Sequence, residues 1–370
     1  IAAGANHSLA LDTKGRVWTW GLNTSGQLGR KNGATGDRPA DINNAAAYKP
    51  TMMKGFGGQD LNNVLEIAGT ADTTAVLLID GTVWTVGSNA HGELGAGLLP
   101  TEMAASDALV RVHHSAESRD VKGQMVEAEE IHDINKIKGR GYNFAIITRG
   151  KELYVWGDNS SEQIGASRWV EKKANGTEAM ARVTPQMATK PVKVQKAVAN
   201  SATDSILRNV VDVSIGGYRY TETSGGGTIV TKTSPVQILA VTMDVEIDTT
   251  GGLTQIVDRD YQSWAWGSNQ YHKAGSTADY EHSMPAARAT RVDLFDPDEN
   301  STYLEDGIQI KSMAAGGNHS AAYDERGIVW TWGANRYGQL GNFEYGLEES
   351  SGEKKWKVEK QPQRVDEAHI

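Results

Sequence analysis

The chain of 370 residues contains no cysteine, and this absence removes several classes of site. Disulfide scaffolds, thiolate-bound metals and cysteine nucleophiles all require that side chain. No apolar run reaches the roughly 18 residues that a membrane-spanning helix needs. Basic residues are not in surplus either: 37 Lys and Arg stand against 46 Asp and Glu, a formal net charge of −9. Because nucleic-acid binding depends on a basic face that neutralises phosphates, we expect no nucleic-acid partner.

Proline is scarce, with nine residues, whereas glycine is abundant, with 41, a balance that suits many tight turns. The ten tryptophans are not scattered. Eight of them fall in one repeated pattern, an apolar strand that ends in W-x-W-G or a close variant. Self-similarity of this kind indicates a repeat architecture. The eight are Trp18, Trp20, Trp84, Trp156, Trp264, Trp266, Trp330 and Trp332, and Trp169 and Trp356 lie outside the pattern.

Superposing the copies without gaps defines six repeat starts. The first copy reads IAAGANHSLALDTKGRVWTWGLNTSGQLG, and the last reads MAAGGNHSAAYDERGIVWTWGANRYGQLG. The fourth copy aligns only over its first half and is short enough to share a blade with the fifth. The six starts are Ile1, Ile67, Ile137, Val213, Ile247 and Met313.

Each copy predicts an antiparallel hairpin, because two short apolar strands flank a glycine-containing turn. In the first copy the strands cover residues 8–11 and 17–20, with the turn at Lys14 and Gly15. Trp18 and Trp20 are two residues apart, so they share one face of the strand. Two large rings on one face favour burial against a neighbouring sheet. The asparagine that follows, Asn23 in this copy, suits a turn capped by its side chain.

A proline followed by a short apolar stretch then returns the chain, at residues 50–53, 191–194, 235–238 and 362–365. Proline is tolerated at the first residue of a strand. With one more strand near the next repeat start, each unit has about four strands, and radial repetition of such sheets is a β-propeller. We therefore expect one all-β domain over residues 1–370. It should have about six (six to seven) four-stranded antiparallel blades with long inter-strand insertions, and its two ends should meet at one seam.

The runs at residues 4–10 and 316–322, both of the form G-x-N-H-S-x-A, are followed by W-x-W-G and N-x-x-G-Q-L-G. This combination resembles the repeat of the regulator of chromosome condensation family, here as a divergent bacterial or viral member. The resemblance implies a propeller, usually of seven blades. It also implies several unrelated functions: nucleotide exchange on a Ran-type GTPase, chromatin docking, substrate binding in ubiquitin ligases and inhibition of secreted β-lactamases. The protruding β-wedge and charged loop residues of the exchange factors match no position in this sequence.

Residues that could carry chemistry are few. His7 and His319 occupy the same repeat position and are each followed by serine. A nucleophilic site needs a base, a nucleophile and an orienting acid in one pocket, so a pair copied on two units favours a structural role. His113, His114 and His132 lack the spacing of a metal site. The glycine cluster at residues 224–227 precedes no helix, which argues against phosphate binding.

Residues 296–302 place oxygen ligands at alternate positions, with Asp296, Asp298 and Asn300, like the start of a calcium loop. Ser301 stands where the turn glycine belongs, and Gly307 where the closing glutamate belongs. An acidic surface turn is the alternative. We expect no catalytic residue, no metal and no cofactor.

The insertions, at residues 30–63, 97–133, 166–209 and 276–307, are either a partner-binding surface or decoration that packs over the blades. Aromatic and basic side chains are typical anchors of protein interfaces. We therefore predict two candidate partner-binding sites, one at Arg168 and Trp169 and the other at Trp356 with its neighbours Lys355 and Lys357. The sequence therefore favours a noncatalytic interaction or structural propeller that binds a protein or surface glycan and forms part of a larger chain or assembly. We expect it outside the cell or on a cell or virion surface. The alternative is a guanine-nucleotide exchange factor for a small GTPase, in the cytoplasm.

Overall fold

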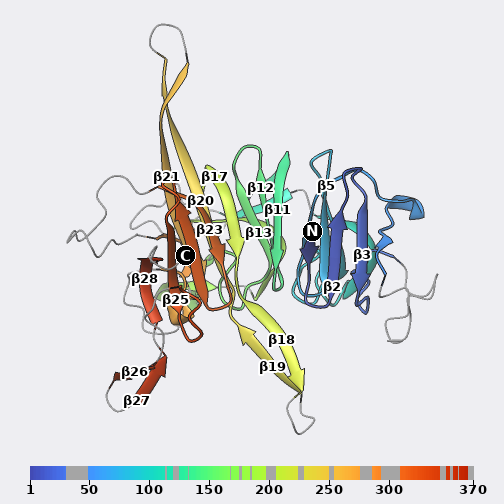
Figure 1. Cartoon of the computed structure of the whole chain (residues 1–370). Helices are drawn as coiled ribbons and strands as arrows, with labels where there is room; N and C mark the ends of the chain where they lie inside the picture. The colour runs from blue at the N-terminus through green and yellow to red at the C-terminus, as the bar shows by residue number, and fades with distance from the viewer. Residues whose placement is uncertain are drawn as a thin grey trace.

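The computed structural model describes residues 1–30, 49–112, 115–119, 125–131, 133–166, 168–174, 177–183, 186–196, 206–223, 229–249, 254–275, 286–292, 309–341, 347–350, 353–356 and 358–365. These residues form five antiparallel four-stranded blades that follow one another along the chain (Figure 1). The all-β propeller class is thereby confirmed. Apart from short 3-10 turns at Phe56–Gly58 (η1) and Gln270–His272 (η3), the regular structure described here is strand.

The strands of each blade pair in chain order, from the innermost to the outermost. The first blade has β1 (Ala2–Ala3), β2 (His7–Leu11), β3 (Val17–Gly21) and β4 (Thr51–Met52). The second has β5 (Val64–Gly69), β6 (Thr73–Leu78), β7 (Val83–Ser88) and β8 (Ala105–Arg111). The third has β11 (Ile134–Arg140), β12 (Asn143–Thr148), β13 (Leu153–Asp158) and β16 (Met187–Lys193). The fourth has β17 (Val210–Ile215), β20 (Gln237–Asp248), β21 (Gln255–Gly267) and β22 (Ala286–Arg291). The fifth has β23 (Ile310–Ala315), β24 (His319–Asp324), β25 (Val329–Ala334) and β28 (Val358–Arg364).

The central hairpin of each blade is the predicted one. In the first blade His7 pairs with Gly21 and Leu11 with Val17, and in the fifth His319 pairs with Gly333 and Tyr323 with Val329. The predicted asparagine turn is also confirmed, because the Asn23 side-chain oxygen accepts the Leu28 N–H at 2.9 Å. The same contact recurs in the other four blades, from Leu94 to Asn89, Ile164 to Asn159, Ala274 to Asn269 and Leu340 to Asn335.

The described residues form five blades for six repeat starts, because the fourth and fifth copies are two halves of one blade. The short fourth copy had indicated such a shared blade, and this interpretation is confirmed. Val213 lies in β17, the first strand of this blade, whereas Ile247 lies near the end of β20 and starts no unit. The gap-free alignment failed here because a hairpin, β18 (Tyr218–Thr223) with β19 (Ile229–Ser234), is inserted between the first two strands. For the same reason residues 235–238 are not a return strand, since they lead into β20.

The other three predicted return segments lie in the strands β4, β16 and β28. Pro191 and Pro362 fall inside β16 and β28, so the expected place of proline at the first residue of the strand is wrong for these two. The insertions contain further strands. β9 (Ser115–Arg119) adds in parallel to β16 and pairs with β10 (Met125–Glu130). Two separate hairpins are β14 (Arg168–Ala174) with β15 (Thr177–Val183), and β26 (Leu347–Ser350) with β27 (Glu353–Trp356).

Consecutive blades pack through their first strands: β5 contacts β1 and β11, and β17 contacts β11 and β23. The prediction that the two ends share or adjoin a blade is wrong. In Figure 1 the first blade (β2, β3) and the fifth (β25, β28) stand at opposite ends of the row, with the third between them. No strand of the first blade packs against the fifth blade as neighbouring blades do in the described ranges. The blades form an open arc.

Joints between the blades and candidate interaction surfaces

The second tryptophan of the W-x-W-G pattern ties each of the last three blades to the blade before it. The indole N–H groups of Trp156, Trp266 and Trp332 each donate a 2.9 Å hydrogen bond to a backbone carbonyl of the preceding blade. The acceptors are Glu93, Gln163 and Lys273, which share one position of the N-x-x-G-Q-L-G turn. All three indoles are fully buried, so the predicted packing against a neighbouring blade is confirmed for them. We call this set of contacts the inter-blade joint.

The first tryptophan of the pattern bonds within its own blade instead. Trp18 donates to Asp12 at 3.2 Å, Trp264 to Thr242 at 3.0 Å and Trp330 to Asp324 at 3.3 Å. Trp264 and Trp330 are buried, whereas Trp18 and Trp84 are half-buried. The first tryptophan of the strand therefore bonds within its own blade, and the second bonds to the preceding blade. The spacing of the two residues in the sequence does not distinguish these roles.

A hydroxyl reinforces two of the joints. Thr74 donates to the Gln27 carbonyl at 2.7 Å, and Ser320 donates to the Lys273 carbonyl at 2.7 Å. Thr74 and Ser320 occupy the same repeat position, which directly follows that of His7 and His319. The hydroxyl accepts in turn from the preceding blade, from His7 in one joint at 3.0 Å and from Gln237 in the other at 2.7 Å.

His7 is thus a structural group and does not activate the adjacent Ser8. Because the Thr74 hydroxyl gives its only hydrogen to Gln27, the proton that joins His7 to Thr74 must lie on His7 Nε2. Nδ1 is buried without a partner, and the ring lies so close to Gly4 that a Cβ there would be 2.4 Å from Nδ1. Burial lowers the pKa of His7 from 6.5 to about 4, since a charged ring would have no acceptor.

Lys273 is a second buried cationic group of the joints. Its side chain is fully buried, and Nζ donates to the carbonyl oxygens of Pro235 and Gly317, the latter at 3.0 Å. Burial lowers its pKa from 10.5 to about 7. Because Nζ donates to backbone carbonyls of both the fourth and the fifth blade, Lys273 joins these two blades.

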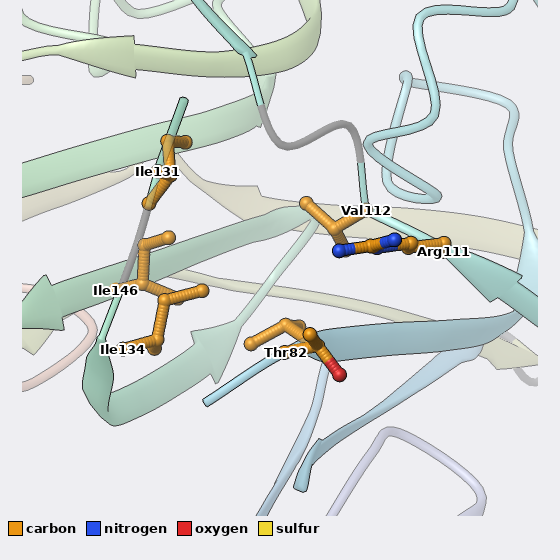
Figure 2. Close-up of a pocket in the computed structure, with 7 residues that line it drawn as sticks. Thr82, Arg111, Val112, Ile131, Ile134 and Ile146 are labelled. Atoms are coloured by element: carbon orange, nitrogen blue, oxygen red, sulfur yellow. The ribbon is translucent and has the colours of Figure 1, made fainter. Parts of the chain in front are cut away.

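The cavity in Figure 2 lies between the second and third blades, and its volume is about 20 Å³, enough for about one water. Isoleucines of the third blade face Val112 and Arg111 across it. Its walls are mainly apolar, and a substrate needs a far larger space. The lining residues are Thr82, Val83, Arg111, Val112, Ile131, Ile134 and Ile146. In the described ranges no three metal-ligating side chains come together, and no helix could cross a membrane.

The predicted anchor residues lie on two separate peripheral hairpins. Arg168 and Trp169 begin β14, and Lys355 and Trp356 end β27, while Lys357 lies outside the described residues. Whether these residues bind a partner stays a prediction. The metal and phosphate candidates, namely His113, His114, His132, the glycine cluster at 224–227, and Asp296, Asp298 and Asn300, also lie outside the described residues.

The most prominent projection was not expected from the sequence. β20 and β21 pair continuously from Gln237 opposite Gly267 to Asp248 opposite Gln255, but β17 pairs with β20 only as far as Thr242. Residues 244–248 and 255–260 therefore leave the blade as a two-stranded ribbon, the long yellow and orange hairpin of Figure 1. We call this ribbon the finger. The signal available in the sequence was the lengthened spacing between Gln237 and Trp264.

The finger combines exposed apolar side chains with opposed acidic ones. Ile247 and Ile256 face each other across the ribbon and are 54% and 55% exposed. Asp244 pairs directly with Asp260, both exposed. Like charges directly opposite one another destabilise a sheet. The amides of Asn209 and Gln262 donate to Asp244 and Asp260, respectively.

Comparison with known proteins agrees with the repeat pattern. Models of the regulator of chromosome condensation (RCC1) repeat match residues 1–27 and 310–339, and residues 326–368. Over 92% of this chain, protein pim1 of Schizosaccharomyces pombe and the ultraviolet-B receptor UVR8 of Arabidopsis thaliana are each 23% identical to it. The chain spans 48% of pim1 and 66% of UVR8.

Among solved structures, Prp20p of Saccharomyces cerevisiae is 18% identical with a TM-score of 0.43, over the whole of this chain and 77% of that one. The matched repeats include the joint residues of the first and fifth blades, and the blades have the four-stranded form that the repeat implies. The chain is an RCC1-like β-propeller, whose first and last blades match the repeat of the regulator of chromosome condensation family.

Proposed function

We propose that the chain is a noncatalytic interaction module that binds a protein partner through the finger. The observation that carries this proposal is the exposed pair Ile247 and Ile256 on a ribbon that leaves the body of the fourth blade. A two-stranded ribbon without a third strand gains little stability from its own contacts. The opposed Asp244 and Asp260 weaken it further. Side chains that do not serve folding are best explained by a partner.

The chemistry of the finger specifies the kind of partner. Two isoleucines side by side fit an apolar pocket, and the acidic pair beside them fits a rim of Lys or Arg. Apolar anchors ringed by polar contacts are the usual anatomy of a protein interface. A glycan offers no apolar pocket of this kind, so a protein is the favoured ligand.

Display of the protein on a cell or virion surface remains part of the proposal, and the cytoplasm is the alternative location. Fractionation of the source cells distinguishes the two locations.

The test places a photo-crosslinking amino acid at position 247 of the full chain and, as the matched control, at position 79. Ile79 is 67% exposed in a turn of the second blade, far from the finger in the sequence. A protein captured from the source cells only by position 247 is then purified, and its affinity is measured.

We expect the double variant Ile247→Ser with Ile256→Ser to weaken this binding at least tenfold, and Ile79→Ser to leave it unchanged. Equal capture at both positions, or equal affinity of the two variants, would contradict the proposal. A captured glycoprotein whose binding is lost on deglycosylation would move it to a glycan ligand.

The second candidate function is nucleotide exchange on a small GTPase. It rests on the finger as a protruding ribbon, and on a relative in Canis lupus familiaris called X-linked retinitis pigmentosa GTPase regulator, 23% identical over 95% of this chain and 30% of that protein. Release of a fluorescent guanine nucleotide from GTPases of the source organism tests it. Acceleration by the wild-type chain that is lost in the isoleucine double variant would favour exchange, whereas unchanged release would leave the interaction role.

A further inference from the structure

The finger continues the face of the fourth blade that packs against the fifth. In β20, Leu239 and Val241 are fully buried in the core between these two blades. Val245 and Ile247 follow at the same two-residue spacing, so their side chains project from the same face of the strand. Val245 is half-buried and Ile247 is 54% exposed. An apolar face that belongs to the core within the blade therefore reaches solvent in the finger.

The opposite face of the finger is acidic. Asp244 and Glu246 alternate with the apolar residues along β20, and Asp260 lies directly across from Asp244. All three of these carboxylate side chains are exposed. Because Ile256 lies across from Ile247, β21 contributes to the apolar face as well. The ribbon thus presents one apolar face and one negatively charged face.

The hydrogen bonds at the base of the finger show which way the edge of β20 points. Met243 donates its backbone N–H to the Asn209 carbonyl at 2.9 Å, away from β21. Backbone groups alternate in direction along a strand, so the N–H of Val245 points out from the same edge. Asn209 has a φ of 58°, and Leu207 donates to the Val194 carbonyl, so the chain enters β17 from the third blade and not along the finger.

The outer part of this edge is accessible. Asp244, Glu246 and Ile247 are consecutive members of the strand with exposed side chains, apart from the half-buried Val245 between them. In Figure 1 the finger rises above the other labelled strands. Apart from β21, no segment among the described residues pairs with β20 beyond Met243.

We infer that the partner of the finger binds by adding a strand of its own to this edge of β20. This inference rests on the proposed function and specifies how the partner is recognised. The added strand lies where β17 would continue past Asn209, and a partner carbonyl accepts the N–H of Val245. Its side chains alternate between the two faces of the ribbon. Those beside Val245 and Ile247 are apolar, and those beside Asp244 and Glu246 are Lys or Arg.

The charges of the finger disfavour a second copy of this chain as the added strand. Two copies of β20 paired edge to edge would bring Asp244 and Glu246 beside the same acidic residues of the other copy. Like charges in such positions destabilise a sheet, and charged side chains on an edge protect against self-association. A segment that alternates apolar and basic residues meets no such repulsion.

Proline substitutions on the two edges of the finger test this geometry. Val245 lies directly opposite Arg259. Directly opposed residues of an antiparallel pair exchange both backbone hydrogen bonds or none, so the Arg259 N–H points out from the opposite edge. Proline at either position therefore removes no hydrogen bond of the ribbon, and only Val245→Pro blocks addition to β20. Arg259→Pro is the matched control.

The probe is a displayed library of short random peptides, selected on the full chain. We expect the selected peptides to alternate apolar and basic residues and to bind Arg259→Pro as they bind wild type. Val245→Pro should weaken their binding about tenfold or more, because it removes the N–H that main-chain pairing uses.

Amide hydrogen exchange gives a readout that is specific to strand addition. In the wild-type complex the Val245 N–H should be protected relative to the free chain, and the Arg259 N–H should not. If Val245→Pro fails to fold, this difference in protection tests the inference in its place.

Selection that yields no peptide, or only peptides without the alternation, would overturn the inference. Equal binding by the two proline variants would do the same, as would a Val245 N–H that exchanges equally fast in the free and bound chains. Failure of the proposed function is a separate result. A partner captured at position 247 that binds both proline variants equally uses the finger but not its edge, whereas the absence of any captured partner contradicts the proposed function and leaves peptide binding unaffected.

Discussion

Replacing His7 by glutamine is expected to keep the joint between the first two blades and to remove its sensitivity to acid. The fourth blade supplies the precedent, because Gln237 occupies the same position and donates to Ser320 at 2.7 Å. A glutamine at position 7 can donate to Thr74 in the same way. Its second polar atom would be unpaired, as His7 Nδ1 and Gln237 Oε1 already are. At pH 8 the free energy of unfolding should therefore change little.

The pH dependence follows from the lowered pKa. His7 has a pKa of about 4 when folded and 6.5 when unfolded, so between these values the unfolded chain binds more protons. Stability then rises with pH across this window and is lost as the pH falls. The linkage amounts to about 2 kcal/mol between pH 7 and pH 5 for one such group. His7→Gln should remove this loss.

Urea unfolding of wild type and His7→Gln at pH 8, 7, 6 and 5 measures the difference directly. Carboxylates contribute equally to both proteins and cancel in the comparison. His319→Gln is the matched control: burial lowers the pKa of His319 as well, but its ring is half-exposed, so the change in slope should be smaller. Equal acid losses in wild type and His7→Gln would refute the assignment of His7 as a buried neutral group.

Trp330→Ala should lower the free energy of unfolding by about 3–5 kcal/mol, because the ring is fully buried; a wild-type melting temperature would contradict its place in the core. Lys273→Met should remove a pH dependence of the same sign as that of His7, but at higher pH, because burial lowers the pKa of this cationic group as well. Between pH 7 and the unfolded pKa of 10.5 the folded wild type holds fewer protons, so wild type should gain about 2 kcal/mol over the variant from pH 7 to 9, measured by urea unfolding. Replacing residues 168–183 by a short Gly-Ser link should preserve cooperative thermal unfolding, because β14 and β15 pair only with each other. Removing 187–193 as well should unfold the third blade, since β16 is its fourth strand; equal melting temperatures of the two deletions would argue against this strand assignment.

The propeller class could be predicted from the sequence because its signals are local. The glycine turn, the two tryptophans and the asparagine cap act within about 30 residues of each other, and each copy repeats them. The same locality explains the failure at the fourth blade. A gap-free comparison assumes constant spacing, but the hairpin β18–β19 and the lengthened β20 and β21 separate the two halves of the unit. Ile247 was consequently read as a repeat start when it belongs to the finger.

The joints could not be predicted, because they connect residues that are far apart in the chain. Trp266 reaches an acceptor 103 residues away, and Trp156 one that is 63 residues away. The same W-x-W-G pattern contains one tryptophan that bonds inside its blade and one that bonds outside, and only the packing of blades distinguishes them.

By itself the sequence determined the local architecture: strand-forming segments, turns and four-stranded units, since these depend on neighbours along the chain. The tertiary structure decided the number of blades, the open arc, the neutral state of His7 and the reach of the finger. Each of these depends on which distant surfaces exclude water from one another. Burial between blades is a property of the assembled fold, and no pattern of adjacent residues encodes it.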